Sequence, residues 1–192
     1  LGLRLTEAYG IIEVGLPFVN HDADGSLGRP LPDYELRLDQ PDQSGTGEIL
    51  LRGPGMLDAY FSPWRTRDEI LQDGWFRTGD LGRLDGAGRL SIVGRTKLVI
   101  NFNGMKVFPY EVEDVLLRHP LVAECRVFGE PHPTYGHLPC AEVVLVPGAD
   151  PATTPREIRA FCFRHLAAYK VPKEVRPLPQ LPRTASGKVR QT

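Results

Sequence analysis

The sequence lacks the cysteine and histidine patterns that mark many metal-binding and redox proteins. It has only three cysteines in 192 residues, Cys125, Cys140 and Cys162, and no two of them form a C-x-x-C pair. Its five histidines show no H-x-x-x-H spacing. A cysteine-based metal cluster and a redox dithiol are therefore not expected. We expect three reduced, mostly buried thiols in a cytoplasmic protein.

Long hydrophobic runs and an excess of either charge are also missing. No apolar stretch approaches the roughly 20 residues that a membrane-spanning helix needs, and no signal peptide is visible. The 23 basic and 24 acidic side chains give a formal net charge of −1. This balance gives no electrostatic reason to expect nucleic acid or a membrane surface as a partner. Because the first residue is Leu1, we expect the natural N-terminus to lie upstream.

What is present is the composition of an ordinary globular protein, with 41% hydrophobic and 24% charged residues. Up to about residue 96, short β-prone runs are cut by proline and glycine, and residues 35–38 alternate polar and apolar side chains. These runs predict a small barrel or sandwich of antiparallel strands. We also expect a helix over 62–72, with Pro63 at its first position, and a hairpin over 83–93.

Beyond residue 96 the pattern changes to β-α-β-β-α-β, which indicates a second, small domain. Strands are expected at 98–102, 105–108, 122–128, 141–146 and 174–178. Asn103-Gly104 is a strong hairpin signal between the first two strands. One helix is expected to begin at Pro109, and a capping-box pattern at 154–157 begins another. The second helix should carry one apolar stripe formed by Ile158, Phe161, His165 and Leu166. The joint between the domains is expected near residues 95–98.

Six short motifs follow one another along nearly the whole chain. They are YGxxE from Tyr9, GEI from Gly47, DGWFRTGD from Asp73, GRTK from Gly94, GMKVFPYEVE from Gly104 and PRTASGK from Pro182. Each alone has an ordinary structural explanation. Their succession closely resembles the adenylate-forming (AMP-binding) superfamily, which includes acyl-CoA synthetases, adenylation domains of peptide synthetases and firefly-type luciferases.

The resemblance implies an α+β fold in two parts. Residues 1–96 would be the C-terminal remainder of the large AMP-binding domain, a small antiparallel barrel or sandwich. Residues 97–192 would be the mobile small C-terminal domain, a three-stranded sheet with flanking helices. The hinge between the two would lie near Lys97, about which the small domain turns between two half-reactions.

In the first part, the resemblance implies a nucleotide site. Asp80 matches the acid that holds both ribose hydroxyls of ATP, and a carboxylate with two acceptor oxygens suits a cis-diol. Arg95 matches the arginine near the ribose and phosphate, and Glu13 matches the acid that helps to hold Mg²⁺. Tyr9 and Gly10 would lie against the adenine. The plainer alternatives are a turn cap for Asp80, a surface salt bridge for Arg95, a solvated acid for Glu13 and core packing for Tyr9.

In the second part, the resemblance implies residues that act on the reacting groups. Lys188 matches the lysine that bridges the substrate carboxylate and the α-phosphate, where a positive charge stabilises the transition state. Asn103 and Gly104 match the loop that lines the pantetheine tunnel, where glycine lets a thin chain pass close to the backbone. Lys106 stands where some relatives place a phosphate-facing arginine. The plainer alternatives are an ordinary exposed lysine for Lys188 and a simple hairpin turn for Asn103 and Gly104.

Two departures from the family pattern bear on activity. Ile12 stands where many relatives have a threonine whose hydroxyl touches phosphate, which removes one hydrogen bond worth about 1.5–3 kcal/mol. The Ser/Thr/Gly-rich phosphate loop of the family is absent from these 192 residues. We therefore expect a fragment that cannot form an acyl-adenylate by itself.

The function implied is that of an ATP-dependent carboxylate–CoA ligase, which forms acyl-AMP and then an acyl thioester. Its substrates and cofactors would be a small carboxylic acid, ATP, Mg²⁺ and coenzyme A, with no nucleic-acid partner. FPYEVE, from Phe108, is most like the acyl-CoA ligase form of its motif. Two alternatives stay open: an adenylation domain that loads the phosphopantetheine arm of an acyl carrier protein, and a catalytically inactive relative that acts as an interaction or regulatory module.

Overall fold

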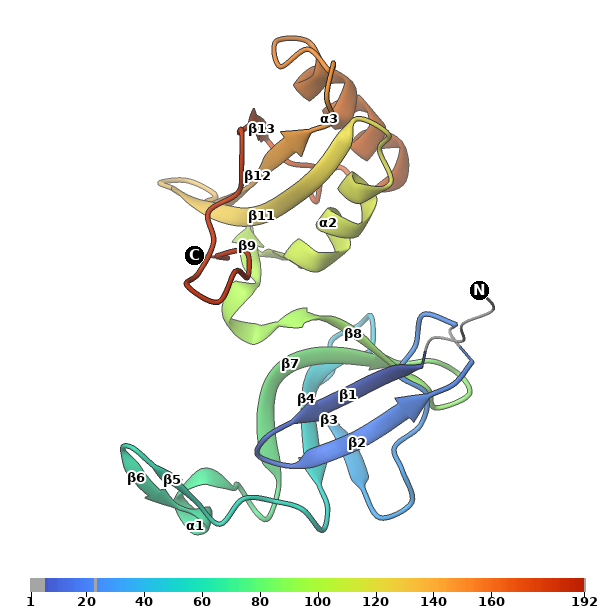
Figure 1. Ribbon diagram of the computed structural model, residues 1–192, viewed down its shortest axis with the longest axis vertical. Coiled ribbons are helices and arrows are strands. Elements are labelled where there is room, and N and C mark those ends of the chain that lie inside the picture. Colours follow the sequence, from blue (N-terminus) through green and yellow to red (C-terminus); the bar gives the residue numbers. More distant parts are fainter. Residues whose placement is uncertain (1–5, 23, 192) are drawn as a thin grey trace. The chain divides into compact units, whose positions relative to one another are not determined.

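A computed structural model describes residues 6–22 and 24–191 (Figure 1). The chain divides into two units, unit 1 (Leu1–Thr96) and unit 2 (Lys97–Thr192). Each unit has its own cluster of buried hydrophobic side chains. No helix of the described ranges is both long enough and apolar enough to cross a membrane.

Unit 1 is built almost entirely from antiparallel strands. Its elements are β1 (Glu7–Ile11), β2 (Gly15–Asn20), β3 (Glu35–Asp39), β4 (Thr46–Arg52), β5 (Ala59–Phe61), β6 (Trp64–Thr66), α1 (Arg67–Ile70), β7 (Phe76–Leu84) and β8 (Leu90–Arg95). One four-stranded sheet has the order β3-β4-β7-β8, while β1 with β2 and β5 with β6 form separate pairs. The predicted hairpin over 83–93 is confirmed, since Arg83 pairs with Ser91 and Leu84 with Leu90.

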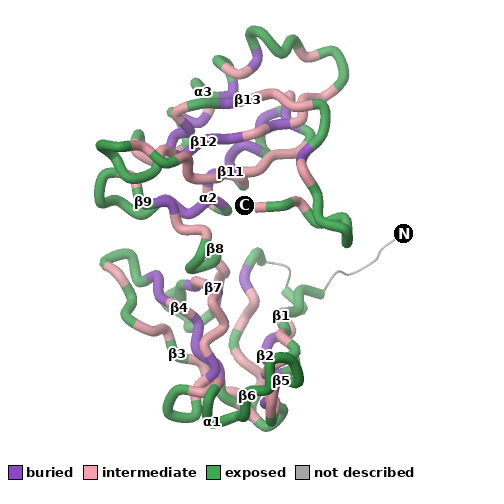
Figure 2. The backbone as a smooth tube through the Cα atoms, turned by 90° about the vertical axis from the view of Figure 1, so that its left-hand side faces the viewer, coloured by how far each residue is buried: buried purple, intermediate pink, exposed green. Residues whose placement is uncertain are grey.

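The core of unit 1 joins the β1–β2 pair to the four-stranded sheet. Phe18 on β2 is fully buried in one cluster with Ile49 on β4 and Leu90 on β8, and Figure 2 shows the buried stretch along β4. The β1–β2 pair packed on the four-stranded sheet forms the sandwich that the sequence predicts. Within the described residues the edge strands β3 and β8 do not pair with each other, so the alternative of a closed barrel is wrong.

The helix predicted over 62–72 is wrong in its first half. Ser62 and Pro63 form the turn of the β5–β6 hairpin, and only Arg67–Ile70 is helical. A residue that precedes proline is biased away from the helical region, which favours a turn at this place. The helix instead begins at Arg67, after the N-cap residue Thr66. The Thr66 backbone N–H donates to Glu69 Oε2 at 2.6 Å, and such a capping contact is typical of a helix start.

Unit 2 is an α+β domain, as predicted. A 3-10 turn, η1 (Thr96–Leu98), spans the boundary between the two units in the chain. The elements of unit 2 that follow are β9 (Ile100–Phe102), β10 (Met105–Val107), α2 (Pro109–Leu117), β11 (Val122–His132), β12 (Gly136–Leu145), α3 (Thr154–His165) and β13 (Glu174–Pro177). β11 and β12 form a long hairpin, and β13 runs parallel to β12. Val112, Val115 and Leu116 on α2 are buried at the predicted spacing.

The sheet of unit 2 has five strands instead of the three expected, because the β9–β10 hairpin joins it. The junction is a single pair, Phe102 with Gly136 at the start of β12. Gly136 has a φ of +76°, and a Cβ there would lie 2.9 Å from the Asn101 carbonyl oxygen. Only glycine allows so close an approach without strain. On α3 the buried residues are Thr154, Ile158 and Cys162, whereas His165 of the predicted stripe is exposed.

Candidate active site

Three of the predicted site residues meet in unit 1 around a buried carboxylate. Asp80 on β7 is 5% exposed. Its Oδ2 accepts a hydrogen bond from the Tyr9 hydroxyl at 2.6 Å, and its Oδ1 lies 2.9 Å from Arg95 Nε. The Arg95 side chain is 69% exposed, so the cluster runs from the core of unit 1 to its surface.

The β7–β8 hairpin explains how Asp80 meets Arg95. The two residues are directly paired across the strands, after an irregularity between Leu81 and Gly82 that shifts the register. Side chains directly opposite each other on antiparallel strands lie close enough to interact. The backbone at Asp80 is also held locally, because its N–H donates to Thr78 Oγ1 at 3.0 Å and Thr78 in turn donates to the Ile49 carbonyl at 2.9 Å.

Tyr9 reaches Asp80 from β1, 71 residues earlier in the chain. Burial, reinforced by the hydrogen bond to the Asp80 carboxylate, raises the pKa of the Tyr9 hydroxyl well above its ordinary value. The hydroxyl therefore stays protonated at neutral pH and acts as a donor. Its ring packs edge-on against Phe18, with 6.0 Å between the ring centroids, which fixes the direction of that donor.

Gly10 and Glu13 lie on the β1–β2 hairpin next to Tyr9. A Cβ on Gly10 would stand 2.8 Å from the Gly15 carbonyl oxygen, so the paired strand alone requires glycine there. Glu13 is half-buried in the turn, and its Oε1 accepts a hydrogen bond from the Tyr60 hydroxyl at 2.8 Å. Ile12 in the same turn is 97% exposed. The Ile12 side chain therefore does not pack into the core of unit 1.

The donor set at Glu13 fits a hard cation such as Mg²⁺. Carboxylate oxygens are the ligands that Mg²⁺ prefers, and it commonly binds proteins through only one or two of them. The second oxygen of Glu13 accepts no hydrogen bond from the described residues. Glu13 could therefore supply one ligand.

A second acidic residue supports the part of β7 that directly precedes Asp80, and the sequence reasoning did not single it out. Glu48 on β4 accepts a hydrogen bond from the Gly79 N–H at 3.1 Å and also contacts Arg77. Arg77 in turn pairs with Asp39 at 2.7 Å. Gly79 has a φ of +73°, a conformation suited to glycine. The signal was present in the GEI motif, but nothing local in the sequence links Glu48 to residue 79.

In unit 2, Asn103 and Gly104 form the turn between β9 and β10. Both have positive φ values, 49° and 78°, as a two-residue hairpin turn requires. The Asn103 N–H donates to the Tyr135 carbonyl at 2.9 Å, which ties the turn to the β11–β12 hairpin. No atom lies within 4 Å of the position that a Cβ on Gly104 would take. Lys106 follows on β10 with its side chain exposed.

Lys188 lies on a short hairpin loop near the end of the chain, with its side chain exposed. Arg183 and Val189 pair across this loop, and the Thr184 N–H donates to the Lys188 carbonyl at 2.8 Å. Gly187 occupies the turn with a φ of +82°. The fold thus presents Lys188 on an ordered backbone, on a different element from Asn103 and Lys106.

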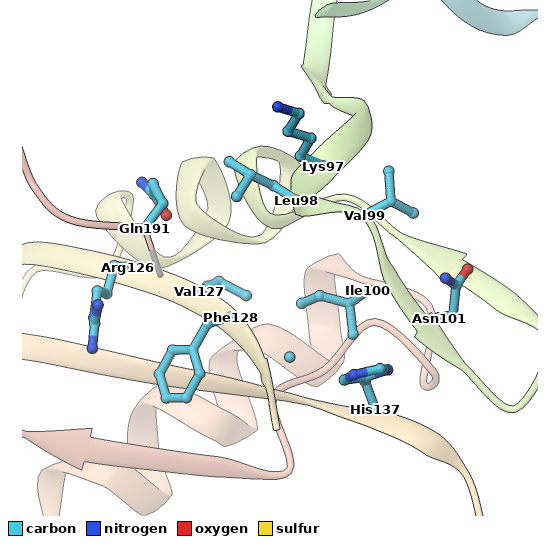
Figure 3. Close-up of a pocket in the computed structure, with 11 residues that line it drawn as sticks. Lys97, Leu98, Val99, Ile100, Asn101, Arg126, Val127, Phe128, His137 and Gln191 are labelled. Atoms are coloured by element: carbon cyan, nitrogen blue, oxygen red, sulfur yellow. The ribbon is translucent and has the colours of Figure 1, made fainter. Parts of the chain in front are cut away.

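A cavity of about 410 Å³ within unit 2 lies beside the predicted hinge residue (Figure 3). Its lining includes Lys97, Ile100, Arg126, His137 and Gln191. Figure 3 shows the Lys97 side chain directed away from Ile100 and His137. The Oε1 atom of Gln191 is buried and has no hydrogen-bond partner among the described residues.

The cysteines offer no competing chemistry. None is in a disulfide, and burial raises the pKa of the Cys125 thiol to about 12 and those of Cys140 and Cys162 to about 11. Cys140 lies with Glu130 and Glu174 in a group whose ligand atoms are within 4.8 Å of one another. Arg176 already pairs with both carboxylates, so a guanidinium provides the positive charge that this group needs.

Comparison with known proteins supports the reading of the motifs. Residues 111–188 match the model of the AMP-binding enzyme C-terminal domain. The chain is 38% identical to a long-chain-fatty-acid–CoA ligase of Salmonella typhimurium, over 98% of this chain and 35% of that protein. It is 36% identical to an oxalate–CoA ligase of Arabidopsis thaliana, over 99% of this chain and 39% of that protein.

A solved structure is similar over the same extent. It is the o-succinylbenzoate CoA synthetase of Bacillus subtilis in complex with its acyl-adenylate intermediate, with a TM-score of 0.85 and 33% identity. The match covers 99% of this chain and 40% of that one. The chain thus spans 35–40% of the length of these relatives. It belongs to the adenylate-forming (AMP-binding) superfamily, and its residues 111–188 carry that family's C-terminal domain.

Proposed function

We propose that this chain is part of an ATP-dependent carboxylate–CoA ligase. The observation that carries the proposal is the cluster around Asp80. Each oxygen of this buried carboxylate has one donor, Tyr9 or Arg95, and a carboxylate oxygen can accept two hydrogen bonds. Two adjacent hydroxyls, such as those of a ribose, match the acceptor capacity that remains.

The reaction proposed has two half-reactions. In the first, a carboxylate oxygen of the substrate attacks the α-phosphorus of ATP, the bond to the β-phosphate breaks, and acyl-AMP and pyrophosphate form. In the second, a thiol sulfur attacks the acyl carbon, its proton is released, and the bond to AMP breaks to give a thioester. Lys188 serves the first half-reaction, because its ammonium offsets the repulsion between two approaching anions.

The other predicted residues keep the roles that the resemblance implies. Asp80 and Arg95 hold the ribose and the nearby phosphate, with Tyr9 and Gly10 against the adenine. Glu13 would hold Mg²⁺, which when bound offsets the negative charge of the phosphates. Lys106 also serves the nucleotide. In unit 2, Lys97 acts as the hinge, and the turn formed by Asn103 and Gly104 lines the path of the pantetheine arm.

Coenzyme A is the proposed acceptor. The FPYEVE motif and the names of the relatives support it, since the two curated relatives are CoA ligases. A carrier-protein pantetheine arm presents the same thiol, so it is the alternative acceptor. The residues that follow the first motif, Val14, Gly15, Leu16 and Pro17, suggest an apolar acid as substrate. Of these, Leu16 is exposed, whereas Val14 is buried in the core of unit 1. The cytoplasmic location stays a prediction.

A catalytically inactive relative is the second candidate function. Ile12 favours it, because its exposed side chain cannot donate a hydrogen bond to phosphate where many relatives carry a hydroxyl. The presence of Asp80, Arg95 and Lys188 favours the ligase. An interaction module would have no need of a buried carboxylate with unused acceptor capacity.

Hydroxamate formation by the full-length protein, measured with a panel of carboxylic acids and ATP, separates these candidates. We expect at least one acid to react, and we expect K188A to lower the rate by about 100-fold. R118A is the matched control, because it removes an exposed salt bridge of unit 2 at the C-terminal end of α2. Silence of the wild-type protein with every acid would favour the inactive module. Hydroxamate formation without acyl transfer to free CoA would favour the carrier protein.

A further inference from the structure

The loop that carries Lys188 is tied to the sheet of unit 2 by two arginines. Arg183, at its start, donates from Nη1 to the Gly187 carbonyl at 2.9 Å and from Nη2 to Glu124 Oε2 at 2.5 Å. Glu124 belongs to β11, a strand of the five-stranded sheet. The peptide group that directly precedes Lys188 is therefore connected through one guanidinium to a regular strand.

Arg126 holds the other side of the loop. Its Nη1 donates to the Arg190 carbonyl at 2.6 Å, and its Nε pairs with Glu142 on β12 at 2.6 Å. Because alternate residues of a strand share a face, Glu124 and Arg126 act from the same face of β11. Both ends of the loop are thus anchored to one strand, with Lys188 between the two anchors.

The contacts of Arg183 act on the direction of Lys188 rather than on the core. The carbonyl of Gly187 is part of the peptide bond to Lys188, so a donor on that oxygen fixes the peptide plane from which the lysine side chain departs. The side chains of Arg183 and Glu124 are both partly exposed, 42% and 43%. Removing Arg183 therefore opens no cavity in unit 2. Gly187, in a left-handed conformation, resists reorientation less than a residue with a side chain would.

We propose that Arg183 is a positioning residue for Lys188, acting through the Gly187 carbonyl and the ion pair with Glu124. The inference rests on the proposed role of Lys188 in acyl-adenylate formation. It predicts a selective defect, in which loss of Arg183 slows the first half-reaction and leaves the second unchanged. A residue needed only for the folding of unit 2 would affect both.

The test uses the full-length protein with the variants R183A, K188A, R183A/K188A and R118A. Acyl-adenylate formation is followed by carboxylate-dependent pyrophosphate release, and thioester formation is followed from synthetic acyl-AMP and CoA. We expect R183A to lower the first rate about 10-fold, the size of effect expected for a hydrogen bond from a charged donor. The second rate should change less than about twofold, and in the K188A background R183A should have no further effect.

R118A is the control for loss of an exposed arginine. It removes a salt bridge to Asp114 at the C-terminal end of α2, and the two side chains are 61% and 56% exposed, so both half-reactions should be unchanged. Equal losses in both half-reactions of R183A, or a full additional loss in the K188A background, would overturn the positioning role. If K188A itself leaves acyl-adenylate formation unchanged, the proposed function of Lys188 is refuted, and the inference about Arg183 falls with it.

Discussion

Removing the hydroxyl of Tyr9 and the carboxylate of Asp80, separately and together, tests the arrangement on which the candidate nucleotide site depends. The variants are Y9F, D80A and the double variant. The contact joins a neutral donor to a buried carboxylate at 2.6 Å, and charge-assisted bonds are stronger than neutral ones. We expect a coupling free energy of about 1.5 kcal/mol, at the lower end for such bonds because Tyr9 is only half-buried.

The contact of Arg95 with the same carboxylate gives an internal comparison. The Arg95 side chain is 69% exposed although its partner Asp80 is buried, and an ion pair whose cation is screened by solvent in this way contributes about 1 kcal/mol or less. The cycle R95A, D80A and their combination should therefore give a smaller coupling free energy than the Tyr9 cycle. Any cavity that D80A leaves enters both cycles equally and cancels from the comparison.

The assay is urea unfolding followed by tryptophan fluorescence, because this signal reports on unit 1, which contains Tyr9, Asp80 and Arg95. The two tryptophans of the chain, Trp64 and Trp75, both lie in unit 1. A coupling between Tyr9 and Asp80 below about 0.5 kcal/mol, less than the net value of a typical hydrogen bond, would refute the reasoning. So would a coupling no larger than that between Arg95 and Asp80.

Three further predictions concern pH and packing. The raised pKa of Tyr9 contributes stability that is complete below about pH 10. This stability is lost as the pH rises toward the pKa of Tyr9 in the folded protein. In Y9F the urea midpoint, measured above pH 9, should therefore fall less steeply with pH than in the wild type. G82A should destabilise unit 1 by about 1–3 kcal/mol, because its Cβ would lie 2.7 Å from Leu90 Cδ1, whereas G86A meets nothing within 4 Å and should be neutral. Burial raises the pKa of Glu113, so the wild type should lose stability as the pH rises from 4 to 7 and this buried side chain ionises. E113Q has no such charge, so its free energy of unfolding, measured by circular dichroism, should rise relative to that of the wild type over this range.

The sequence was most informative where its signals are local. The turn at 85–88 identified the β7–β8 hairpin, and the hairpin register places Asp80 opposite Arg95. The Asn103-Gly104 step identified a turn whose two positive φ values follow from those residue types. The spacing of α2 identified its buried face. In each case a few adjacent residues determine the geometry.

The sequence was least informative where distant segments meet. The bond from Tyr9 to Asp80 joins strands 71 residues apart, and no local pattern specifies which residue of β1 will face β7. The joining of the β9–β10 hairpin to the sheet of unit 2 was missed for the same reason, since β9 meets that sheet through one glycine on a strand 34 residues away. The first half of the helix predicted over 62–72 shows the opposite failure, in which a local signal at Pro63 fitted both a helix start and a hairpin turn.

The two candidate groups differ in how much of each residue the fold holds. Asp80 is fixed through its side chain, because both carboxylate oxygens have protein donors and the residue is buried. Lys188 is fixed through its backbone, while its ammonium stays exposed at the end of a flexible stem. A carboxylate that must match two stereochemically defined hydroxyls needs a fixed side chain. A lysine that supplies positive charge to one of two half-reactions needs only a fixed backbone, with a side chain free to extend to the reacting groups. The proposed roles of the two residues therefore require different support, and Arg183 matters because it holds the one part of Lys188 that the fold controls.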